Sequence, residues 1–274
     1  MHKVASLNGE FIAAEKAKIS AAASAAFYGR GVFTTVAIYG GKPFLWDKHL
    51  RRLQRDADKI GLKGVEIGAV GNSLIDVIKH NEVENGRTRI TIYDRASSGA
   101  WEIGSKSGAA ILIVTGGLRE AVRHPRLTVS PFPINSRSPL AGVKSCNYLE
   151  NLMAIEEAQR RGLDEGVRLN ERGEVTSGCM ANLFWELDGR LFTPSLATGC
   201  LAGTTREFLM ESLDCEEVAV GIEALQQVDG VYICSAGLGV SQISSLDERT
   251  FEHRDREILH LIPPKHTKTR TSAS

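Results

Sequence analysis

The chain has 274 residues, with 33 Lys and Arg against 33 Asp and Glu, so its formal net charge is zero. Nucleic acids and anionic membranes select basic surfaces, and this charge balance therefore argues against either as the main partner. At 42% hydrophobic and 24% charged residues, the composition is that of a folded globular protein and excludes general disorder.

Apolar runs and cysteines indicate the compartment. The longest apolar run, 109–114, has the length of a strand and falls far short of the ~20 residues of a membrane-spanning helix. The N-terminal residues lack the apolar core of a signal peptide. The five cysteines are odd in number and no pair has metal-ligand spacing. We therefore expect reduced thiols, a cytoplasmic location and no metal site.

In the N-terminal part, strands are expected to alternate with helices. A β-branched run at 32–39, the turn Gly40-Gly41 and a returning segment at 42–46 indicate a hairpin. Asp47 is then expected to cap a helix, and the next apolar residues follow helical spacing up to Gly61. Three further elements are expected before the middle of the chain, a helix around 74–79 and strands at 89–93 and 109–114.

The C-terminal part is predicted to follow a polar linker at 116–125, which begins with a Gly-Gly pair. A helix is expected at 147–161, with Leu149, Leu152, Met153 and Ile155 as its apolar positions. The other expected elements are a strand at 127–130, hairpins at 167–175 and 183–192, a helix from about Thr204, and strands at 217–220 and 231–234.

These elements lack a regular βαβ rhythm, so the prediction is an α+β fold with two subdomains. The first domain is expected at 1–115 and the second at 126–262, joined by the linker at 116–125. The last segment, 263–274, is rich in Pro, Lys, Thr and Ser and is expected to be a disordered tail.

Three segments carry residue types that suit chemistry. Lys144 lies between an irregular run and a helix start, and a desolvated lysine forms Schiff bases, although most lysines are simply solvated. Gly203-Thr204-Thr205 opens an amphipathic helix, where N–H groups and hydroxyls could bind a phosphate; the alternative is an ordinary threonine cap. Arg52 flanks the buried side of the first long helix and could reach a phosphate, or it could remain in solvent.

Taken in order, these segments resemble the class IV (fold type IV) pyridoxal-phosphate aminotransferases. That family includes branched-chain and D-amino-acid aminotransferases and 4-amino-4-deoxychorismate lyases, and the resemblance extends over nearly the whole chain, from about 7 to 243. The matching stretches are Tyr28-Gly29-Arg30-Gly31-Val32-Phe33, His49-Leu50-Arg51-Arg52-Leu53, Lys144-Ser145-Cys146-Asn147, Gly173-Glu174-Val175-Thr176, Asn182-Leu183-Phe184 and Gly203-Thr204-Thr205-Arg206.

The resemblance implies roles for individual residues. Lys144 is implied to be the catalytic Schiff-base lysine, and pyridoxal 5′-phosphate the cofactor. The implied cofactor-binding residues are Arg52, Lys144, Ser177, Asn182, Thr204, Thr205, Ser235 and Ala236. Arg30, Arg89 and Arg95 are the candidates for binding the carboxylate of a small amino substrate. Because members of this family are usually dimers, we also expect a homodimer.

One position departs from the family pattern. The family has a glutamate directly after the Val-Thr pair, which keeps the pyridine nitrogen protonated and makes the ring an electron sink. Here that position is Ser177, and Glu174 lies three residues earlier. A serine can hydrogen-bond the nitrogen but cannot hold a proton on it, so the ring is expected to be a weaker sink.

This departure bears on the reaction, because full transamination relies on a strong sink whereas elimination can expel a leaving group instead. The local sequences Phe33-Thr34-Thr35 and Ser145-Cys146 also resemble the lyase branch. The sequence therefore favours a lyase that eliminates pyruvate from 4-amino-4-deoxychorismate to give 4-aminobenzoate. An amino-acid or amine aminotransferase and a catalytically silent scaffold are the alternatives.

Overall fold

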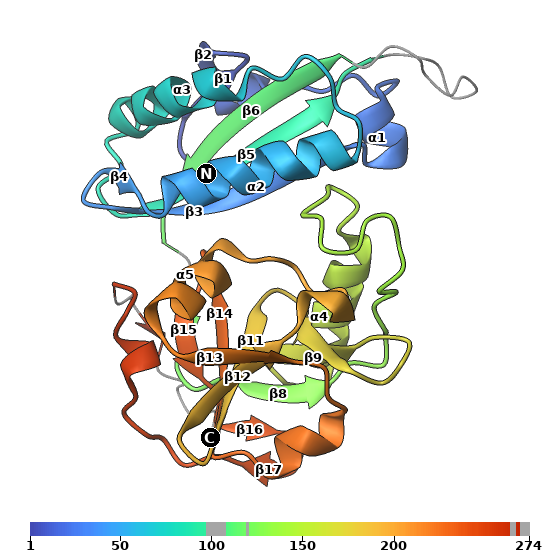
Figure 1. Cartoon of the computed structure of the whole chain (residues 1–274). Coiled ribbons are helices and arrows are strands. Elements are labelled where there is room, and N and C mark those ends of the chain that lie inside the picture. The colour runs from blue at the N-terminus through green and yellow to red at the C-terminus, as the bar shows by residue number, and fades with distance from the viewer. Residues whose placement is uncertain (97–107, 119–120, 264–266, 269–274) are drawn as a thin grey trace. The chain divides into compact units, whose positions relative to one another are not determined.

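A computed structural model describes residues 1–96, 108–118, 121–263 and 267–268. The chain divides into two compact units (Figure 1). One unit is Met1–Arg119 together with Val143–Asn147, and the other is Glu120–Gly142 together with Tyr148–Ser274. The segment with Lys144 therefore packs with the first unit, although it lies within the range 126–262 that the sequence assigns to the second domain. Both units contain helices and sheets, which confirms the predicted α+β class.

The described part of the first unit forms a six-stranded antiparallel sheet in the order β2-β1-β6-β5-β3-β4. Helix α2 packs against β3, and α3 packs against β1 and β6. Buried Ile38, Leu53, Leu74, Ile90 and Ile113 belong to the core between these helices and the sheet. The elements are β1 Val4–Leu7, β2 Glu10–Ala13, α1 Ser24–Tyr28, β3 Gly31–Tyr39, β4 Lys42–Pro43, α2 Trp46–Lys59, α3 Ile67–His80, β5 Gly86–Asp94 and β6 Ala109–Gly116.

The first hairpin is confirmed, and its turn has both glycines at positive φ, 52° at Gly40 and 71° at Gly41. The returning strand ends at Pro43 and is shorter than expected: Phe44 N–H still donates to Ala37 O at 2.8 Å, and Leu45, at a φ of 53°, then turns the chain away. Asp47 is not the helix cap. Leu45 turns the chain in a left-handed conformation and α2 begins at Trp46, so Asp47 lies in the first turn, where a carboxylate favours the helix dipole.

In the described part of the second unit, two five-stranded sheets have the orders β10-β9-β8-β16-β17 and β13-β12-β11-β14-β15. Buried Leu127, Val167, Leu183, Trp185 and Val231 join them in one core. The elements are β8 Arg126–Val129, α4 Leu149–Arg160, β9 Glu165–Leu169, β10 Val175–Gly178, β11 Asn182–Leu187, β12 Arg190–Pro194, α5 Thr204–Ser212, β13 Cys215–Val218, β14 Gly230–Ser235, β15 Gly239–Gln242, β16 Ser245–Leu246 and β17 Arg249–Thr250.

Two short strands lie in segments that the sequence treats as a linker and a tail. Strand β7, Ala121–Val122, falls in the predicted linker and pairs in parallel with β18, Thr267–Lys268. Most of the predicted tail, 264–266 and 269–274, lies outside the described residues.

Helix α4 exposes three of the four apolar residues that the sequence identifies in it. Leu149, Leu152 and Met153 are 66%, 44% and 45% exposed. The buried residues are instead Ala154, Ile155 and Ala158, because the small alanines let the helix lie close to the neighbouring strand β9. Among the described residues, no helix is long and apolar enough to span a membrane.

Candidate active site

The backbone around Lys144 is held in the first unit by the start of β3. Phe33 N–H donates to Lys144 O at 2.9 Å, and Cys146 N–H donates to Gly31 O at 2.8 Å. The Lys144 N–H in turn donates to Oδ2 of Asp56 on α2 at 3.0 Å. Hydrogen bonds at both its N–H and its C=O therefore fix the backbone of Lys144. Its Nζ lies 4.7 Å from the centre of the Phe33 ring.

The surroundings of Lys144 favour its neutral amine. Burial and the guanidinium groups of Arg52 and Arg89 lower the pKa of Lys144 to about 7, while the Asp56 carboxylate opposes them. An ordinary lysine is protonated at neutral pH, whereas a substantial fraction of this one is a free amine. Such an amine can act as a nucleophile and as a base.

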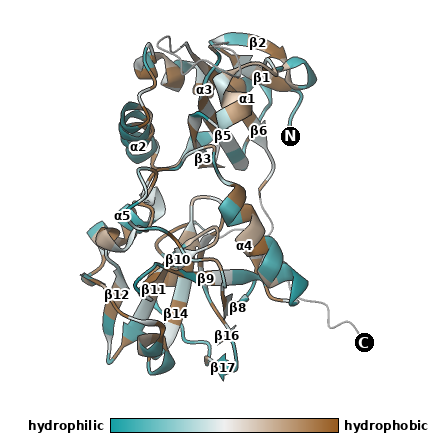
Figure 2. Ribbon diagram, turned by 90° about the vertical axis from the view of Figure 1, so that its right-hand side faces the viewer, coloured by the Kyte–Doolittle hydropathy of each residue, from teal (hydrophilic) through white to brown (hydrophobic). Residues whose placement is uncertain are grey.

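Arg52 lies on α2, which is hydrophilic over most of its surface (Figure 2). It is buried, and its Nη2 donates to Thr34 Oγ1 on β3 at 2.8 Å. The same hydroxyl lies 2.7 Å from His49 Nδ1. Burial, Arg52 and Lys144 hold the pKa of His49 well below its usual value, which favours the neutral imidazole. The Thr34 hydroxyl thus links Arg52 and His49.

The three candidate substrate arginines have different surroundings. Arg89 lies on β5 with its Cζ 3.6 Å from the Phe33 ring centre, close enough to influence Lys144. Arg30 contacts buried Asp94 at 3.3 Å and donates to Gly61 O at 3.1 Å, which offsets its charge. Arg95 is exposed at the end of β5. The structure therefore brings Arg89 to Lys144 and engages Arg30 elsewhere.

A second group of candidate residues lies within the second unit, at one end of a sheet. Asn182 begins β11 and Ser235 ends β14, and the register pairs Asn182 with Cys234, the residue before Ser235. Asn182 Nδ2 donates to Leu201 O at 2.8 Å, just before α5. A Cβ at Gly203 would lie 2.0 Å from Asn182 Oδ1, so any larger residue at this position requires the Asn182 amide to move.

The start of α5 has the features of an anion site. Thr204 and Thr205 form its first turn and are 2% and 3% exposed. The first turn of a helix directs N–H groups toward its N-terminal end, where the helix dipole also favours negative charge. Ser235 ends β14 and Ala236 begins the turn that follows, where Ser235 Oγ accepts from Leu238 N at 3.1 Å.

Ser177 is buried near the end of β10, and the turn after it is closed by Gly178 N–H donating to Ala181 O at 2.8 Å. The two neighbouring glutamates, Glu165 and Glu174, are hydrogen-bonded to groups other than Ser177. Glu165 accepts from the backbone N–H groups of Gly166, Cys179 and Met180. Glu174 accepts from the Asn170 amide and from Arg172.

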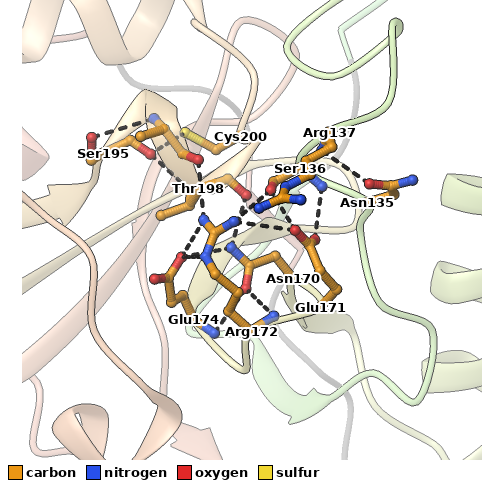
Figure 3. A network of polar contacts seen from close by, with 11 residues as sticks. Asn135, Ser136, Arg137, Asn170, Glu171, Arg172, Glu174, Ser195, Thr198 and Cys200 are labelled. Carbon is orange, nitrogen blue, oxygen red and sulfur yellow. Dashed lines mark hydrogen bonds and ion pairs between the residues drawn. The ribbon is translucent and has the colours of Figure 1, made fainter.

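A polar network holds the loop between β9 and β10 (Figure 3). Arg172 donates to Glu174, to Glu171 and to the Ser136 hydroxyl. Glu171 accepts from both the amide and the hydroxyl of Ser136, at 2.9 and 2.7 Å. Asn170 donates to Thr198 O at 3.2 Å. The network therefore ties the strand that carries Ser177 to the segment that leads into α5.

The structure places four residues beside the candidate site residues that the sequence does not nominate: Thr34, His49, Asp56 and Glu165. The helical spacing contains a signal for two of them, because His49 and Asp56 lie three residues before and four residues after Arg52, on the same face of α2. Thr34 and Glu165 carry no local signal. Among the described residues, no three His, Cys, Asp or Glu side chains are grouped so that they could hold a metal ion.

Known proteins resemble this chain over most of its length. A family model described as amino-transferase class IV matches residues 31–246. The aminodeoxychorismate lyase of Bacillus subtilis is 27% identical over 261 residues, covering 92% of this chain and 89% of that protein. The branched-chain-amino-acid aminotransferase of Salmonella typhimurium is 27% identical over 266 residues, covering 88% of this chain and 84% of that protein.

A solved structure agrees with the fold. The crystal structure of the branched-chain aminotransferase of Thermoproteus uzoniensis with norvaline has a TM-score of 0.89 at 24% identity, covering 95% of this chain and 93% of that one. The chain belongs to the class IV aminotransferases and is an enzyme of this pyridoxal-phosphate-dependent family.

Proposed function

We propose that this chain binds pyridoxal 5′-phosphate through Lys144 and uses it to eliminate pyruvate from 4-amino-4-deoxychorismate, giving 4-aminobenzoate. The residues fit an anionic cofactor that carries an aldehyde. The pKa of Lys144 of about 7 provides an amine able to bond the aldehyde. A dianionic phosphate suits a buried guanidinium such as that of Arg52, and it also suits the N-terminal turn of a helix such as α5.

When bound, this cofactor supplies an aldehyde that condenses with amines and a conjugated ring that accepts electron density from the adjacent carbon. The chain's own residues do the rest. Lys144 would hold the cofactor through its amine, and the same amine, once released, would take the proton from the substrate carbon that bears the amino group. The resemblance to the family implies that Arg52 and the α5 threonines bind the phosphate, and Arg89 is the best placed of the three arginines to receive a substrate carboxylate near Lys144.

The observation that carries the choice of a lyase is Ser177. Glu174, close to it in sequence, and Glu165, across the strand pair, are hydrogen-bonded to other partners, so neither of them takes the place of the family glutamate. A weaker electron sink suits a reaction whose driving force comes from aromatisation of the product. The similarity to the Bacillus subtilis lyase supports the same choice.

The experiment is a direct assay of the purified chain reconstituted with pyridoxal 5′-phosphate. We expect 4-amino-4-deoxychorismate to give pyruvate and 4-aminobenzoate in equal amounts, and the Lys144→Ala variant to give neither. Bound cofactor with no pyruvate release would overturn the lyase assignment.

Transamination is the second candidate function, and the comparable identity to the Salmonella aminotransferase favours it. It predicts that amino donors convert the bound cofactor to its aminated form and that a 2-oxo acid restores the starting spectrum. A chain that binds the cofactor and turns over neither substrate class would be a silent scaffold.

A homodimer belongs to the same proposal. Leu149, Leu152 and Met153 are exposed along one side of α4, and grouped apolar residues on a surface mark interaction sites. Light scattering coupled to gel filtration should give twice the mass of the chain. A monomer at micromolar concentration would contradict the dimer.

A further inference from the structure

Arg168, on β9, is a buried cation whose charge is weakly compensated. Its side chain is 2% exposed, and its Nε and Nη2 donate to the carbonyl oxygens of Phe132 and Pro133 at 3.1 and 2.9 Å. The carboxylate nearest to it, on Glu150, lies 3.7 Å away and is 79% exposed, so water shares that charge. Burying a cation against neutral carbonyls costs free energy, which points to a use for it.

The strand register places this cation beside Ser177. In the antiparallel pair β9–β10, Arg168 and Ser177 are direct partners, and direct partners project from the same face of a sheet. The register shifts between Val175 and Ser177, and the Thr176 hydroxyl donates to Arg168 O at 2.8 Å. This irregularity decides which residue of β10 shares the face of Arg168, a use of bulges that is common near active sites.

The other titratable groups around this pair do not cancel the charge of Arg168. Glu165 accepts from the backbone N–H groups of Gly166, Cys179 and Met180, so its carboxylate is directed to these amides and not to Arg168. Burial and Glu165 raise the pKa of Cys179 to about 12, so that thiol is neutral. Glu150 on α4 is mostly in solvent.

We propose that Arg168 acts through Ser177 to keep the pyridine nitrogen of the cofactor unprotonated. Ser177 donates its hydroxyl hydrogen to the nitrogen, and the buried guanidinium disfavours a second positive charge beside it. Arg168 is thus a positioning residue that sets the electron demand of the ring. This inference rests on the proposed cofactor and on the place of Ser177 next to its nitrogen.

The test uses the full chain reconstituted with pyridoxal 5′-phosphate labelled with ¹⁵N in the ring, because the ¹⁵N chemical shift reports protonation of that nitrogen directly. We expect the unprotonated signal in the unsubstituted protein across the neutral range. Arg168→Gln keeps a donor for one carbonyl but removes the charge, and should move the titration of the nitrogen upward by about one pH unit or more. Arg168→Lys keeps the charge and should titrate as the unsubstituted protein does.

The matched control is Arg161→Gln, since Arg161 also donates to a backbone carbonyl, Val129 O, but is 43% exposed. It should leave the titration unchanged. Bound cofactor with a protonated nitrogen in the unsubstituted protein, or the same titration in Arg168→Gln, would overturn this inference alone. Protein that yields only the signal of free cofactor would overturn the proposed function and this inference with it.

If Arg168→Gln fails to fold, as judged by thermal unfolding, the Arg168→Lys variant tests whether the charge keeps the nitrogen unprotonated. A protonated nitrogen in folded Arg168→Lys would contradict the role of the charge, and an unprotonated one would support it.

Discussion

The Lys144 amide donates a hydrogen bond to the carboxylate of Asp56, a residue 88 positions earlier in the chain and only 2% exposed. The carboxylate also accepts from the Arg55 guanidinium at 2.9 Å. Asp56 therefore has two separable effects: its oxygen fixes the lysine backbone, and its charge raises the pKa of Lys144 against the nearby arginines.

Asp56→Asn should separate these effects, because asparagine keeps an oxygen for the Lys144 amide and removes the charge. The pKa of Lys144 should fall below about 7. The midpoint for attaching pyridoxal 5′-phosphate, followed by absorbance against pH, should move down by about one pH unit. Asp58→Asn, on the exposed side of the same helix, is the control and should leave the midpoint in place. Equal midpoints in Asp56→Asn and the unsubstituted protein would refute the electrostatic role.

Thr34→Val should weaken cofactor binding without unfolding the chain. Valine has the shape of threonine but cannot link Arg52 to His49, so the guanidinium loses a hydrogen bond that orients it. We expect a Kd for pyridoxal 5′-phosphate about tenfold higher, measured by fluorescence titration. Thr35→Val, on the opposite face of β3, should bind as before. Similar losses in the two variants would show that the effect belongs to the strand and not to the hydroxyl.

Local chemistry explains which parts of the fold are predictable from the sequence. The hairpin predicted at 183–192 is present, and its turn residues Asp188 and Gly189 both adopt positive φ, 50° and 74°, which few residue pairs do readily. Helix α4 shows the limit. Its sequence carries apolar residues on more than one side, and only the packing against β9 selects the side with Ala154 and Ala158.

The candidate site, like the fold, is predictable from the sequence only in part. Lys144 and Arg52 stand in recognisable segments, so the sequence can nominate them. Their partners come from pairing between distant segments, as with Asp56 and Thr34. The pairing of Arg168 with Ser177 depends on a register shift that no local pattern encodes.

The polar network around Glu171 predicts how the stability of the fold changes at acid pH. Hydrogen bonds from the amide and hydroxyl of Ser136 lower the pKa of Glu171 to about 2. Because the folded pKa lies below the unfolded value, this group stabilises the fold above about pH 4.5 and loses that effect as the pH falls toward 2. Glu171→Gln should therefore unfold at lower urea concentration at pH 7, and the gap to the unsubstituted protein should narrow below pH 4.5. The exposed Glu248→Gln is the control, and a gap that does not depend on pH would contradict the mechanism.

Gly203→Ala should disrupt the start of α5. The added Cβ would lie 2.0 Å from Asn182 Oδ1, so the amide must move and its 2.8 Å hydrogen bond to Leu201 O must break. We expect a loss of about 1–3 kcal/mol in the free energy of unfolding and at least tenfold weaker binding of pyridoxal 5′-phosphate. Urea denaturation and cofactor titration measure the two effects.

Two further variants show whether the collision with Asn182 is the cause. Gly68→Ala places its Cβ where no atom lies within 4 Å and should be neutral or stabilise the fold by up to ~1 kcal/mol. In the double variant Asn182→Ala with Gly203→Ala, the obstructing amide is gone, so the second substitution should cost much less than it does alone. If the two losses simply add, Gly203 is required for another reason, and the account of how α5 is placed beside β11 is wrong.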